Sequence, residues 1–145
     1  MEVQYNNLYT HFVFTTKHRF PCITENNRNR IEKYITGIVN NHTGKMYAIY
    51  ANPEHVHFLI SRSQNMSEKE LAEIVAEASE IFINTNKLCI GHFSWQNSCS
   101  AFSISKGDID RVCKYILNQP EHHKKQTFER EYQDFLKFYQ HTLSK

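Results

Sequence analysis

Two histidines separated by one residue, His55 and His57, are the side chains of this 145-residue sequence best suited to metal chemistry. They lie in the run from Glu54 to Ile60, which is typical of a buried β-strand. Alternate side chains of a strand point to opposite faces, so both imidazoles point the same way, with α-carbons roughly 6.6 Å apart. Two imidazoles arranged in this way can bind one metal ion. The intervening apolar residues fall on the other face, which helices can cover.

A His-x-His pair is not specific by itself, because nine histidines in 145 residues produce such pairs by chance. A second feature lies far along the chain. Tyr115 and Gln119 are four residues apart in a predicted helix, which puts both on one helical face. Tyr115 lies off the apolar stripe of that helix, so packing alone does not account for it.

Together these motifs resemble the single-tyrosine HUH transposases of the insertion-sequence and REP-associated types. The resemblance is nearly full length and rests on several motifs in the same order. These motifs are residues 11–19, Asn52-Pro53-Glu54-His55-Val56-His57, Trp95-Gln96, Ala101-Phe102-Ser103, Tyr115-Ile116-Leu117-Asn118-Gln119 and the run on to Glu131.

The resemblance implies a metal-dependent transposase that nicks and rejoins single-stranded DNA at hairpin-marked element ends. His55, His57 and Gln119 would hold a divalent metal, and Tyr115 would form a 5′-phosphotyrosine. Two nitrogens with oxygens from glutamine, substrate and water suit Mg²⁺ or Mn²⁺. In such relatives the active form is a homodimer, in which the tyrosine helix of one subunit completes the His-x-His site of the other.

Length and composition predict a single domain. The resemblance implies that residues 1–145 form one HUH transposase domain. Apolar residues make up 40% of the chain, which is typical of a folded globular protein. The formal charge of +2 permits nucleic-acid binding without indicating it. The four cysteines form no Cys-x-x-Cys pair, so no zinc ribbon is predicted. No membrane span and no signal peptide are apparent, so a cytoplasmic protein is expected.

Periodicity and turn residues predict an alternation of strands and helices. The predicted strands are Leu8–Thr16, Lys45–Asn52 and His55–Arg62. Two extended segments, Phe93–Gln96 and Ala101–Ser105, are expected to form one further strand or a strand with a bulged or looped interruption. The predicted helices start at Thr24, at Ser67 with a Ser-x-x-Glu capping box, at Asp108, and near Thr127 with an apolar stripe of Phe128, Tyr132, Phe135, Leu136 and Tyr139. Pro120 is expected to stop the tyrosine helix and to leave Gln119 at its frayed end.

This order predicts an α+β fold, a ferredoxin-like split-βαβ sandwich. Its antiparallel sheet would carry helices on one face, and the tyrosine-bearing helix and a final helix would follow. The first and third strands would be central, so the histidine face would lie in the middle of an uncovered sheet surface. Single-stranded nucleic acids bind to such surfaces in other proteins.

The basic cluster Lys17-His18-Arg19 follows the first predicted strand and suits contacts to DNA phosphates. The family pattern and this sequence differ elsewhere. Many relatives carry Gly-Tyr-Gly after the Trp-Gln pair, where this chain has Ser98-Cys99-Ser100, and a lysine- and serine-rich second helix, where it has residues 74–79 as Ile-Val-Ala-Glu-Ala-Ser. These differences concern DNA contacts and loop geometry and leave the predicted catalytic residues in place.

Two other functions are compatible with parts of the sequence. The first is a hairpin DNA-binding protein of the same fold without cleavage activity, which does not require all four site residues. The second is a metal-dependent hydrolase that uses a water nucleophile. The hydrolase requires a carboxylate near the metal, for which Glu54 is the nearest candidate, and it leaves Tyr115 and Gln119 without roles.

Overall fold

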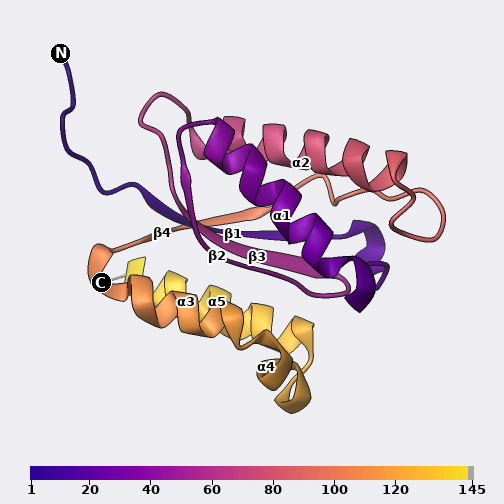
Figure 1. Ribbon diagram of the computed structural model, residues 1–145. Coiled ribbons are helices and arrows are strands. Elements are labelled where there is room, and N and C mark those ends of the chain that lie inside the picture. Colours follow the sequence, from indigo (N-terminus) through magenta and orange to yellow (C-terminus); the bar gives the residue numbers. More distant parts are fainter. Residues whose placement is uncertain (144–145) are drawn as a thin grey trace.

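The computed structural model of the protein describes residues 1–143 (Figure 1). Within that range, the side chains of residues 123, 125, 135 and 138–143 are outside the described part, and with them the predicted packing of Phe135 and Tyr139. The elements, in order, are β1 (Tyr9–Thr15), the 3-10 turn η1 (Lys17–Arg19), α1 (Glu25–Asn41), β2 (Lys45–Ala51), β3 (His55–Ser61), α2 (Glu68–Thr85), β4 (Ser100–Ile104), the 3-10 turn η2 (Lys106–Asp108), α3 (Ile109–Leu117), α4 (Gln119–Lys125) and α5 (Phe128–Leu143).

The four strands form one antiparallel sheet in the order β2-β3-β1-β4. The two central strands are therefore β1 and β3, as the sequence predicts. Their register sets Val13 opposite His57 and His11 opposite Leu59. Side chains directly opposite each other share a face, so His11 lies diagonally next to His57 on the face that carries the histidine pair. The α+β sandwich fold is confirmed.

Helices α1 and α2 cover one face of the sheet (Figure 1). Val56, Phe58 and Ile60 point toward them, as the alternation of β3 predicts. Phe58 stacks on Phe12 of β1 with ring centroids 5.1 Å apart. Burying an aromatic or aliphatic side chain of this size contributes about 1.5–3 kcal/mol, so this layer supplies the main apolar core.

The opposite face is also covered, which corrects the prediction of an open histidine surface. Figure 1 shows α3, α4 and α5 on the side of the sheet away from α1 and α2. Val112 and Ile116 of α3 pack against Leu59 of β3 and Ala48 of β2. Leu59 lies two residues after His57 on the same face, so one end of that face is apolar and provides a docking surface for the stripe of α3.

The predicted helix starts agree with the structure, and the end of the tyrosine helix differs from the prediction. The capping box of α2 is present, with the Ser67 hydroxyl accepting the backbone N–H of Glu70 at 3.1 Å. The tyrosine helix α3 ends at Leu117, and a separate helix, α4, begins at Gln119. Pro120 lies in the first turn of α4, where its missing N–H costs nothing. Gln119 is therefore buried at a helix junction instead of lying at a frayed end.

None of the helices within residues 1–143 has both the length and the apolar composition needed to cross a membrane.

Candidate functional site

His55 and His57 point from β3 to the same side of the sheet, with ring centroids 5.0 Å apart. Their exposed fractions are 0% and 2%, because α3 and α5 close over this face. Both rings are therefore held by protein groups at their edges. These contacts decide which ring nitrogen is available to a ligand.

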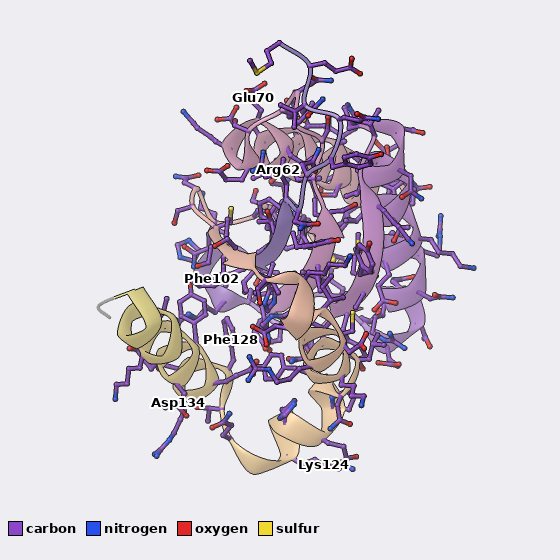
Figure 2. All side chains as sticks on the ribbon, turned by 90° about the vertical axis from the view of Figure 1, so that its left-hand side faces the viewer. Arg62, Glu70, Phe102, Lys124, Phe128 and Asp134 are labelled. Carbon is purple, nitrogen blue, oxygen red and sulfur yellow. The ribbon has the colours of Figure 1, made fainter. Side chains whose placement is uncertain are left out.

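His55 is fixed on three sides. Its Nδ1 lies 2.8 Å from a carboxylate oxygen of Glu54, and its Nε2 lies 3.2 Å from the side-chain nitrogen of Asn52. The ring of Phe128, the first residue of α5, stacks on it with a centroid distance of 3.7 Å and an interplanar angle of 13°. Figure 2 shows Phe128 at the start of α5, between that helix and the sheet. Burial lowers the pKa of His55 to about 4, although Glu54 opposes the shift, so the ring is neutral at pH 7.

His57 is held at both ring nitrogens. Its Nδ1 lies 3.0 Å from Nε2 of His11 on β1, and its Nε2 lies 3.2 Å from a carboxylate oxygen of Glu131 on α5. His11 is itself completely buried, and burial lowers its pKa well below the usual value, with a further decrease from the neighbouring His57. A neutral His11 can accept or donate a single hydrogen bond at Nε2.

Tyr115 of α3 reaches the same site. Its ring lies edge-on to His57 with a centroid distance of 5.8 Å, and its hydroxyl donates a hydrogen bond to Glu131. The side chain is half-buried and packs at the margin of the α3 core. The tyrosine hydroxyl and His57 of one chain therefore contact the same carboxylate.

Gln119, at the start of α4, completes the set of residues selected from the sequence. It is completely buried, and its side-chain oxygen accepts a hydrogen bond of 3.3 Å from the Asn52 nitrogen that also contacts His55. Its own nitrogen donates to the backbone oxygen of Tyr115 at 3.3 Å. The structure thus brings together all four predicted catalytic and metal-site residues.

The basic cluster reaches this site through Arg19. Lys17, His18 and Arg19 form the exposed turn η1 directly after β1. His18 and Arg19 have φ values of 59° and 54°, a left-handed conformation that is uncommon for residues other than glycine. The Arg19 guanidinium lies 3.7 Å from Glu129 and 5.6 Å from the ring centroid of Phe128, so it contacts the first turn of α5.

Glu131 is the main site residue that the sequence analysis missed. Among the described histidines, cysteines and acids, His55, His57 and Glu131 form a group whose ligand atoms lie within 4.8 Å of one another. Two imidazole nitrogens and a carboxylate oxygen suit a divalent transition metal or Mg²⁺. A signal was present, because Glu131 is an acid three residues after Phe128 and next to Tyr132, within the apolar stripe of the last helix.

Asn52 and His11 were also missed as parts of the site. Both are buried polar residues that contact a histidine of the pair. Asn52 precedes Pro53 in the short turn between β2 and β3, which reads as ordinary turn chemistry. His11 is one of several polar residues in β1, and only the β1–β3 register reveals its neighbour.

Two solved structures with folds similar to this chain are both described as transposases. A protein from Deinococcus radiodurans R1 that is assigned as a transposase has a similar structure, with a TM-score of 0.63 and 17% identity over 82% of this chain and 96% of its own. A REP-associated tyrosine transposase bound to a REP hairpin has a TM-score of 0.62 and 14% identity over 85% of this chain and 72% of its own. At these identities the likeness concerns the fold. No curated protein gives a significant match.

The family model of IS200-like transposases matches residues 4–119. This range covers all four strands, the histidine pair, Tyr115 and Gln119, and it ends before α5. Because most of the chain matches, the protein belongs to the family of IS200-like transposases.

Proposed function

We propose that this protein is a metal-dependent single-stranded DNA transposase in which Tyr115 forms a 5′-phosphotyrosine. The observation that carries the proposal is the meeting of the Tyr115 hydroxyl, His55 and His57 in one buried site. The similar fold of a transposase bound to a REP hairpin supports hairpin-containing DNA as the partner. We further propose that residues 1–145 act as one domain and that Lys17, His18 and Arg19 contact DNA phosphates.

The metal would be held by Nε2 of His55 and Nε2 of His57. For His55, Nδ1 is engaged by the Glu54 carboxylate, which leaves Nε2 without a hydrogen. A third protein ligand would be a side-chain oxygen, from Gln119 as the sequence predicts or from Glu131, whose carboxylate lies 3.2 Å from His57. Mg²⁺ or Mn²⁺ suits this set of nitrogens and oxygens.

The reaction is an in-line displacement at phosphorus. The Tyr115 oxygen forms a bond to the scissile phosphorus while the bond from phosphorus to the 3′ oxygen of the upstream strand breaks. That strand leaves as a 3′ hydroxyl after taking up a proton. A divalent ion held by the histidine pair would supply stabilisation of the negative charge that develops on the phosphate.

The protein groups around Tyr115 support its role as a nucleophile. A tyrosine hydroxyl has an ordinary pKa near 10 and attacks poorly at neutral pH without help. Here the hydroxyl already donates its hydrogen to the Glu131 carboxylate, which gives the proton an acceptor at the moment of attack. The covalent link conserves the phosphodiester energy, so a later 3′ hydroxyl can reverse the step and rejoin DNA.

A metal-dependent hydrolase is the second candidate, because Glu131 provides a buried carboxylate next to the histidine pair. In that function a water molecule attacks and no covalent protein–DNA species forms. The hydrogen bond from Tyr115 to Glu131 favours the transposase, since it engages that carboxylate with the tyrosine. Cleavage that persists without the Tyr115 hydroxyl would support the hydrolase instead.

The metal site can be tested with the variants His55→Ala and His57→Ala. We expect each variant to lose Mn²⁺ binding in calorimetry and cleavage of labelled single-stranded hairpin oligonucleotides, because each removes a ligand. DNA binding in band-shift assays should be largely retained, since the surface that contacts DNA is intact. The variants Gln119→Ala and Glu131→Ala, measured in the same calorimeter, identify the oxygen ligand by the larger loss of affinity. Full cleavage in Mg²⁺ by either histidine variant would contradict the proposed ligands.

A further inference from the structure

The two histidines of the pair have different partners behind them. Behind His55, the Glu54 carboxylate lies 2.8 Å from Nδ1. An ionised carboxylate only accepts hydrogen bonds, so Nδ1 of His55 carries the hydrogen and Nε2 is free of it. Second-sphere hydrogen bonds of this kind fix the tautomer and orientation of metal-binding histidines.

Behind His57, the corresponding place is taken by another imidazole. Nε2 of His11 lies 3.0 Å from Nδ1 of His57, and the ring centroids are 5.2 Å apart with an interplanar angle of 42°. Nε2 of His57 lies 3.2 Å from a carboxylate oxygen of Glu131, which favours hydrogen on Nε2 when no metal is bound. His57 can offer Nε2 to a metal only when its hydrogen is on Nδ1. In that state the Nε2 of His11 must accept the hydrogen bond, with its own hydrogen on Nδ1.

The fold holds His11 in this position. It is completely buried on the central strand β1, diagonal to His57 in the β1–β3 register. On its other side lies Phe102 of β4, with ring centroids 6.3 Å apart and the rings at 66°. The ring thus has neighbours from both adjoining strands, and these contacts keep its Nε2 beside Nδ1 of His57.

We propose that His11 is a positioning residue that sets the tautomer of His57 by accepting its Nδ1 hydrogen, so that Nε2 of His57 is available to the divalent metal. The inference rests on the proposed function, in which His57 is a metal ligand. His11 thereby does for His57 what Glu54 does for His55, but as a neutral group that adds no charge to the centre of the sheet.

The first test measures Mn²⁺ affinity by calorimetry in wild-type protein and in the variants His11→Phe and His11→Gln. Phenylalanine fills the space but cannot accept a hydrogen bond, so we expect affinity to fall roughly tenfold to a hundredfold. Glutamine offers a carbonyl oxygen, so affinity should recover to within about threefold of wild type. Equal affinity in wild type and His11→Phe, or no recovery with glutamine, would overturn the inference.

A matched control is Thr10→Val, which changes a buried polar residue of the same strand on the opposite face. It should leave Mn²⁺ affinity unchanged, and thermal unfolding of each variant shows whether it is folded. Wild-type protein that binds no Mn²⁺ would overturn the proposed metal site itself and the role of His11 with it. If wild-type protein binds Mn²⁺ and the His11→Phe variant binds it with the same affinity, only the role of His11 is overturned.

A second measurement needs no variant. In ¹⁵N NMR spectra of wild-type protein saturated with Mg²⁺, we expect His57 to carry hydrogen on Nδ1 only and His11 to have a hydrogen-free Nε2. A role in packing alone would not require either state. Hydrogen on Nε2 of His11 in the metal-loaded protein would contradict the proposal. This result does not depend on whether the variants fold.

Discussion

Burial controls the protonation of the histidines at this site. His55 and His11 are both completely buried, and desolvation is the largest cause of the lowered pKa of each. Removing an imidazolium from water is unfavourable, so both rings are kept neutral. His55 needs this form to bind a metal. The same burial makes the folded protein sensitive to acid, because the unfolded chain binds protons that the folded chain excludes.

The stability of the metal-free protein should therefore fall as the pH decreases. The pKa of His55 is about 4 in the folded state and near 6.5 when unfolded, so its contribution is present above pH 6.5 and is lost between pH 6.5 and 4. From pH 7 to pH 5, His55 alone should account for a loss of about 2 kcal/mol in the free energy of unfolding. Urea denaturation in EDTA at the two pH values measures this loss, and His11 adds to it in the same direction.

The variant His55→Gln should show a smaller decrease in stability over this pH range. His42→Gln is the control, because His42 lies at the end of α1, away from the site, and its ring contacts the Ile38 carbonyl oxygen at 2.8 Å. It should show the same decrease as wild type. A stability that does not change between pH 7 and pH 5 would contradict a neutral, buried His55.

Among the elements, α5 has the closest relation to the site. Phe128 stacks on His55, Glu131 contacts His57 and Tyr115, and the Tyr132 hydroxyl is hydrogen-bonded to Ser100 on β4. Figure 2 shows α5 near β4, where Phe102 is labelled, with Asp134 on its outer side. Ser100 belongs to the segment that differs from the family pattern, and here it forms part of the contact that holds α5.

Weakening α5 should expose Tyr115. In Phe128→Ala the ring that stacks on His55 is removed, so we expect faster chemical acetylation of Tyr115 by N-acetylimidazole, mapped by mass spectrometry. The control is Leu117→Ala, which truncates a side chain on α3 that is 59% exposed and therefore covers little. Tyr115 modified at the same rate in Phe128→Ala and wild type would show that α5 does not limit access to the site.

Most strands and helices could be predicted from the sequence, because their signals are local. The exceptions are Phe93–Gln96, which makes only an isolated bridge from Trp95 to Thr16, and α4, which was not predicted. The alternation of β3 correctly assigns His55 and His57 to one face and Phe58 to the other. The cover over the histidine face could not be predicted in this way, since it depends on how α3 and α5 return to the sheet after their local structure is set. Glu131 joins the site through the same long-range packing.

The break between α3 and α4 has a similar explanation. Pro120 was expected only to end a helix, but proline is equally suited to the first turn of a new one. Asn118 lies between the two helices, and its carbonyl oxygen accepts the backbone N–H of Glu121 at 3.1 Å. At this junction the Gln119 side chain points inward and contacts Asn52. The sequence analysis assumed a continuous helix, which predicts only that Gln119 shares a helical face with Tyr115.

For the whole molecule, the chain brings its own Tyr115 to its own histidine pair. The homodimer stays a prediction from family resemblance, and light scattering should then give about twice the chain mass of 17.2 kDa. If each site is formed within one chain, mixing the His57→Ala and Tyr115→Phe proteins should not restore cleavage. Neither variant chain has both His57 and the Tyr115 hydroxyl. Restored cleavage would indicate that a partner's tyrosine helix completes the site, as the resemblance implies.

The central claim is that Tyr115 becomes covalently attached to DNA. Wild-type protein incubated with Mg²⁺ and a labelled pool of single-stranded hairpin oligonucleotides should give a species that survives boiling in detergent. Tyr115→Phe removes one oxygen with little change in packing, so it should fold and bind Mn²⁺ and DNA, yet give neither cleavage nor adduct. The control is Tyr132→Phe, which removes a tyrosine hydroxyl from α5. This variant should still give the adduct.

Mass spectrometry of the digested adduct is the most direct measurement. The account predicts a nucleotide attached through its 5′ phosphate to the peptide that contains Tyr115, and no such peptide from the Tyr115→Phe protein. An adduct on Tyr132, or cleavage retained by Tyr115→Phe, would contradict it.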